Sequence, residues 1–64
     1  MTGELKFYDP RAGWGLIKGD DATLYAVNHA NVAERPLRVG DRVSFEPRTM
    51  AGGPQATAVR RQSI

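Results

Sequence analysis

Cysteine is absent from this 64-residue sequence, so neither disulfides nor thiolate metal ligands can support the fold. A chain of this length buries only roughly 60% of its unfolded surface, so we expect residues 1–64 to form one small domain held by its apolar core. Long apolar runs are also missing, and no segment approaches the roughly 20 apolar residues of a membrane helix. Nothing near Met1 resembles a secretory signal, so we expect a cytoplasmic protein that binds no membrane.

Residue sets for catalysis or metal binding are equally scarce. His29 is the only histidine, and a lone histidine without cysteine or a second ligand is a poor metal site. No acid pair and no Ser-His-Asp arrangement indicates a reaction. We therefore expect no enzymatic activity, no metal, no cofactor and no small-molecule substrate.

Basic residues modestly outnumber acidic ones, which gives a formal net charge of +2. Seven of the nine basic residues are arginine, which grips phosphate with two hydrogen bonds and stacks on rings. This composition favours an anionic partner, although acids are interspersed among the bases. We expect a monomer or a weak dimer.

Glycine and proline interrupt the chain every roughly eight to twelve residues, which is typical of an antiparallel β meander. The expected strands are residues 4–8, 14–18, 23–27, 42–47 and 55–60. Residues 28–40 should form a connection with at most one short helical turn, because Pro36 stops a helix. Five short strands favour a closed or nearly closed barrel of the OB or SH3-like type, since closure removes unpaired edges.

Alternation of side chains along these strands predicts which of them face inward. The expected core is Leu5, Ile17, Leu24, Ala26, Val43, Phe45, Ala56 and Val59, with Val32, Leu37 and Val39 closing one end. Trp14 and Leu16 would then face outward on the second strand, and Tyr25 and Val27 on the third. Strict alternation from Leu5 would bury Phe7, so the orientations of Phe7 and Tyr8 depend on whether the first strand contains a bulge.

Rings left on an outer sheet face forgo roughly 1.5–3 kcal/mol of burial each, so such a patch usually has a partner. Lys6, Arg11 and Lys18 surround the predicted rings. Cations interleaved with rings on a sheet are typical of surfaces that bind single-stranded nucleic acid, with phosphates on the cations and bases on the rings.

Four runs of the sequence resemble, in order, motifs of the cold-shock domain family. They are GELKFYDPRAGWGLI at residues 3–17, LYAVN at 24–28, GDRVSFE at 40–46 and GPQA at 53–56. The resemblance implies an all-β, five-stranded antiparallel OB-type barrel that binds single-stranded RNA or DNA on strands one to three. It implies a low-specificity RNA chaperone or regulator of gene expression, and an outward-facing Phe7. The binding positions carried over are Lys6, Phe7, Tyr8, Trp14 and Tyr25; Arg11, Lys18 and His29 complete the candidate site.

Four positions depart from the family pattern. Ala12 and Val27 stand where the family has a lysine and a histidine, and Leu16 and Asn28 stand where it has rings. A weaker or differently specific binder follows, with Arg11 and His29 as partial compensation. The alternative is a protein-interaction or self-association module on the same barrel, with weakened or lost nucleic-acid binding, because these departures make the face more aliphatic and less basic.

Overall fold

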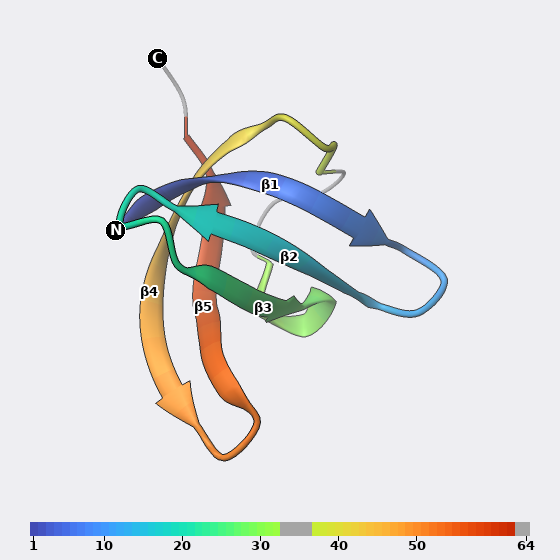
Figure 1. Cartoon of the computed structure of the whole chain (residues 1–64). Helices are drawn as coiled ribbons and strands as arrows, with labels where there is room; N and C mark the ends of the chain where they lie inside the picture. The colour runs from blue at the N-terminus through green and yellow to red at the C-terminus, as the bar shows by residue number, and fades with distance from the viewer. Residues whose placement is uncertain (33–36, 63–64) are drawn as a thin grey trace.

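The computed structural model describes residues 1–32 and 37–62, which form five strands and one short 3-10 helix (Figure 1). The strands are β1 (Thr2–Asp9), β2 (Trp14–Gly19), β3 (Leu24–Asn28), β4 (Arg42–Met50) and β5 (Gly53–Arg61), and η1 spans His29–Asn31. All five predicted strands are present, and their ends differ from the predicted ends by at most three residues. Pro36, expected to prevent a longer helix, lies outside the described residues. Across the described ranges, no helix has the length and apolar character needed to cross a bilayer.

The strands close into a barrel in the order β1-β2-β3-β5-β4, with β4 returning to β1. This confirms the all-β, five-stranded barrel, and the order is compatible with an OB-type fold. One pair corrects the expectation of a wholly antiparallel sheet, because β3 and β5 run parallel over two residue pairs. The direction follows from the other pairs: β4 is antiparallel to β1, and β5 is antiparallel to β4, so β5 runs in the same direction as β1 and β3. In Figure 1 this hairpin runs across the β1–β2–β3 meander, as in orthogonal sheet packing.

The core is a single cluster of buried side chains drawn from every strand. Its members are Leu5, Ile17, Tyr25, Val27, Val32, Leu37, Val43, Phe45, Ala56 and Val59. Eight of these were predicted. The prediction was wrong for Val39, which is 63% exposed beside Gly40, because the chain turns there instead of closing the barrel end.

The third strand is turned over relative to the prediction. Ile17 faces the core, and its direct partner on β3 is Tyr25, so Tyr25 also points inward. Tyr25 and Val27, predicted outside, are buried, whereas Leu24 is 53% exposed and Ala26 is half-buried. The register of the β2–β3 turn causes the reversal, since a slip of one residue moves every side chain of a strand to its other face.

A β-bulge at Lys6 resolves the orientation of the first strand. Leu5 pairs with Ile17 and Phe7 pairs with Leu16, which leaves Lys6 as the extra residue. Leu5 is therefore buried while Lys6 and Phe7 both face solvent. The outward orientation that the family resemblance implied for Phe7 is confirmed.

Candidate functional site

Three rows of side chains cross the outer face of β1, β2 and β3, since directly opposed residues of antiparallel strands lie on the same side. The first row is Asp9, Trp14 and Asn28; the second is Phe7, Leu16 and Ala26; the third is Glu4, Lys18 and Leu24. Glu4 also pairs with Arg42 of β4, which extends the third row. The outer face thus has a ring-bearing end, an apolar middle and a charged end.

Phe7 and Trp14 form an exposed ring pair on this face. Their ring centroids lie 5.1 Å apart with the planes tilted by 49°. Each residue is 42% exposed, which confirms the predicted outward orientation of Trp14. The two large rings therefore pack against each other and still leave part of their surface open to solvent.

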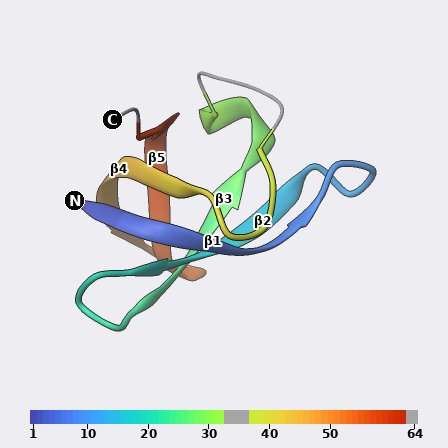
Figure 2. The same cartoon turned by 90° about the horizontal axis from the view of Figure 1, so that it is seen from above.

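The β1–β2 loop that carries Arg11 is built around Asp9. The Asp9 carboxylate accepts hydrogen bonds from the backbone N–H groups of Arg11 (3.0 Å) and Ala12 (3.2 Å), and its carbonyl accepts from Gly13 (2.8 Å). Gly13 adopts a φ of 78°, which glycine tolerates without strain. The loop projects beyond the barrel in both views (Figures 1 and 2). Arg11 is thereby exposed next to the ring-bearing end.

His29 lies beside this loop. Its backbone N–H donates to the Gly13 carbonyl at 2.9 Å, which ties η1 to the β1–β2 loop. A Cβ on Gly13 would lie 3.4 Å from the His29 Cδ2, so the imidazole rests beside the Gly13 backbone. His29 is exposed at the same end of the outer face as Trp14.

Tyr8 lies apart from the ring pair. It pairs with Gly15, the inward-facing residue before Leu16, and it is half-buried against the core. A Cβ on Gly15 would come within 2.8 Å of the Tyr8 Cδ1 and 2.5 Å of the Phe7 carbonyl oxygen. Glycine at position 15 therefore lets the Tyr8 ring and the β1 backbone approach β2 closely.

Tyr25 does not belong to the outer face, and the prediction that it presents its ring there is wrong. Its ring packs against Phe45 in the core, with centroids 5.0 Å apart. Its hydroxyl donates to the Asp21 Oδ2 at 2.7 Å. This hydrogen bond lowers the pKa of Asp21 and raises the pKa of Tyr25. The outer side chains of β3 are instead Leu24, Ala26 and Asn28.

The charged end of the outer face contains two ion pairs. Lys6 donates to Glu4 at 3.2 Å, and the Arg42 guanidinium contacts both carboxylate oxygens of Asp20 at 2.9 and 3.1 Å. The Thr2 hydroxyl also donates to Asp20. The hydrogen bond with Arg42 lowers the pKa of Asp20 and raises the pKa of Arg42.

A shallow pocket of about 300 Å³ lies among these groups. The charged residues that line it are Glu4, Lys6, Lys18, Asp20 and Arg42, and we call it the lysine pocket. Among the described residues, no carboxylate lies within ion-pair distance of Lys18 or Arg11. The predicted cations therefore occupy both ends of the outer face, with Arg11 at one and Lys6 and Lys18 at the other.

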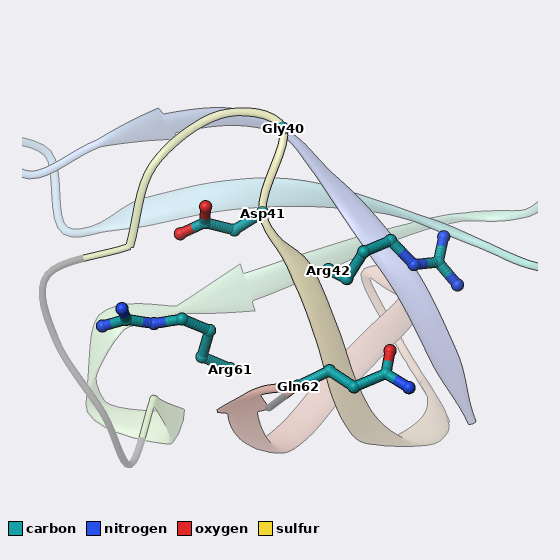
Figure 3. Close-up of a pocket in the computed structure, with 5 residues that line it drawn as sticks. All are labelled: Gly40, Asp41, Arg42, Arg61 and Gln62. Atoms are coloured by element: carbon teal, nitrogen blue, oxygen red, sulfur yellow. The ribbon is translucent and has the colours of Figure 1, made fainter. Parts of the chain in front are cut away.

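A second pocket, of about 440 Å³, lies where the start of β4 meets the end of β5. Gly40, Asp41, Arg42, Arg61 and Gln62 line it (Figure 3). The side chains of Arg42 and Arg61 extend in opposite directions in Figure 3, and the Arg42 guanidinium is engaged by Asp20. This pocket therefore does not bring the two guanidinium groups together on one ligand.

Sequence reasoning missed Leu24 as an outer-face residue and missed the pairing of Glu4 between Lys18 and Arg42. Leu24 could have been found only from the strand register, which the turn at residues 20–23 sets. No group of three or more potential metal ligands gathers in residues 1–32 and 37–62. No protein-family model and no curated protein matches the chain.

Proposed function

We propose that this protein acts by binding single-stranded RNA or DNA on the outer face of β1–β3. The observation that carries the proposal is the half-exposed Phe7–Trp14 ring pair, which has a cation at either end of its face. Every base has a flat apolar surface, and stacking a base on an exposed ring contributes roughly 1–3 kcal/mol. The resemblance of residues 3–17 to the cold-shock motif supports the same assignment.

Low sequence specificity is part of this proposal, and the middle row of the outer face supports it. Its middle row consists of Phe7, Leu16 and Ala26, none of which has a side-chain hydrogen-bond donor or acceptor to read base edges. Stacking alone tolerates any base. Bases paired and stacked in a duplex cannot occupy the rings, so binding would hold strands unpaired, as an RNA chaperone does.

Trp14 provides a direct test because it is the only tryptophan. Titration with oligo-dT and oligo-U of eight nucleotides should change its fluorescence at low salt, while a duplex of the same length should have a much smaller effect. Trp14→Ala should weaken binding of a fluorescently labelled oligonucleotide, measured by anisotropy. Absence of both the fluorescence change and an anisotropy change with wild-type protein would contradict the proposal.

A protein-binding role is the second candidate, and the β3 side of the outer face favours it. Leu24 is 53% exposed beside the half-buried Ala26, and Tyr25 supplies no ring there. An aliphatic surface suits another protein or a second copy better than it suits bases. Sedimentation of the protein alone tests self-association, and Leu24→Gln should weaken it.

A further inference from the structure

The lysine pocket joins the ring pair across one continuous stretch of the outer face. Lys18 lies two residues beyond Leu16 on β2, a separation of about 7 Å along a strand. Leu16 is in turn the direct partner of Phe7. A chain whose bases stack on Phe7 and Trp14 therefore reaches the pocket within a short length of backbone.

The charges of the lysine pocket favour an anion despite its two carboxylates. Three cations face two acids, which gives a formal charge of +1. Both acids are already engaged, Glu4 by Lys6 and Asp20 by Arg42. Glu4 is the strand partner of Lys18, yet its carboxylate contacts the Lys6 ammonium instead. Lys18 is left as the cation whose charge no described carboxylate offsets by an ion pair.

We propose that the lysine pocket binds a backbone phosphate of the single strand that stacks on the ring pair, with Lys18 as the phosphate contact. This inference rests on the proposed function and deepens it, because it fixes the path of the strand along β2 from the rings toward the charged end. Glu4 opposes the binding in this arrangement, since its carboxylate holds the Lys6 ammonium and repels a phosphate.

Two substitutions of opposite effect follow from this geometry. Lys18→Gln should remove one phosphate contact, which makes the negative slope of log K (association) against log salt shallower by about 0.7 for a single strand. Over a fourfold rise in salt, the loss of affinity should then be about 2.6-fold smaller than for the wild type. Glu4→Gln should release Lys6 to the phosphate, so binding tightens and the slope becomes steeper by up to about 0.7.

The experiment measures wild-type and variant binding of oligo-dT of eight nucleotides by Trp14 fluorescence at several salt concentrations. Arg48→Gln and Glu46→Gln are matched controls, because both residues are exposed on β4 outside the pocket and change the net charge equally. Lys18 and Glu4 carry no core packing, and thermal unfolding checks that each variant is folded.

The outcomes separate this inference from the proposed function. A reduced slope for Lys18→Gln alone and tighter binding for Glu4→Gln alone support the phosphate site. The phosphate site is overturned if the wild type binds but Lys18→Gln and Arg48→Gln have equal salt slopes. It is also overturned if Glu4→Gln and Glu46→Gln bind with equal affinity. Either result leaves the proposed function standing. No binding by the wild type at low salt overturns both.

Discussion

Replacing Phe7 by leucine separates stacking from general apolar contact on the outer face. Leucine retains an aliphatic side chain but offers no flat ring to a base. Replacing a stacking ring by alanine costs roughly 1–3 kcal/mol per base, and tenfold in affinity is about 1.4 kcal/mol, so Phe7→Leu should weaken oligo-dT binding by up to roughly 150-fold. A surface that binds a protein through aliphatic contacts would lose much less from the same change.

The fold should survive this substitution. Phe7 is 42% exposed and lies outside the core cluster, so the main loss is its contact with Trp14, worth roughly 0.5–1.5 kcal/mol. A loss of about 1 kcal/mol lowers the melting temperature of a domain this small by roughly 4–8 °C. Trp14 remains as the fluorophore, so the same titration measures wild type and variant.

A distant apolar residue provides the control for Phe7→Leu. Met50 is 50% exposed at the end of β4, in the hairpin that extends away from the outer face (Figure 1). Met50→Ala should leave oligo-dT affinity unchanged. Equal affinity of Phe7→Leu and wild type would refute the reasoning that ring stacking holds the nucleic acid.

Three further predictions concern stability. Ala22 has a φ of 68° in the β2–β3 turn, so Ala22→Gly should relieve strain and raise the free energy of unfolding by roughly 0.5–1 kcal/mol in denaturant titrations; a loss of stability would contradict the strain. Because the hydrogen bond from Tyr25 lowers the pKa of Asp21, its stabilisation is present above the unfolded value and is lost as pH falls below about 4. Melting temperatures measured from pH 7 to 2 should fall less steeply in Asp21→Asn. A Cβ on Gly15 would lie 2.5 Å from a backbone oxygen of β1, so Gly15→Ala should lower thermal stability by roughly 1–3 kcal/mol, whereas Gly52→Ala, with its nearest neighbour at 3.9 Å, should have little effect.

The strands were predicted well because glycine and proline mark their ends. The two faces of β2 were predicted correctly because Trp14 and Leu16 alternate with the inward-facing Ile17 without interruption. It failed on β3 because alternation fixes only relative faces, and the turn decides the absolute one. Tyr25 has an additional reason to turn inward, since its hydroxyl reaches Asp21 at the rim of the barrel while its ring packs on Phe45. The parallel β3–β5 pair depends on how the whole chain closes, which no local pattern encodes.

Sequence reasoning placed Phe7, Trp14 and the cations on the outer face correctly, but it wrongly placed Tyr25 there and missed the boundaries of the face. Phe7 and Trp14 were found through the motif that surrounds them, and Lys6, Arg11 and Lys18 through their proximity in sequence. Alternation already places Glu4 and Lys6 on one face of β1, but their ion pair could not be foreseen, because it depends on the rotamers of two long side chains. Leu24 was wrongly assigned to the core, and Tyr25 to the surface, because the β2–β3 turn decides which face of β3 points inward.

The bulge at Lys6 gives this strand an unusual freedom to change by insertion and deletion. In a regular strand, gain or loss of one residue reverses every later side chain, and the core of the barrel would be lost. Lys6 is the one residue of β1 whose removal would leave Leu5 opposite Ile17 and Phe7 opposite Leu16. A deletion confined to that codon would therefore take away a surface charge and leave Glu4 without its ion pair, while keeping both the core and the ring.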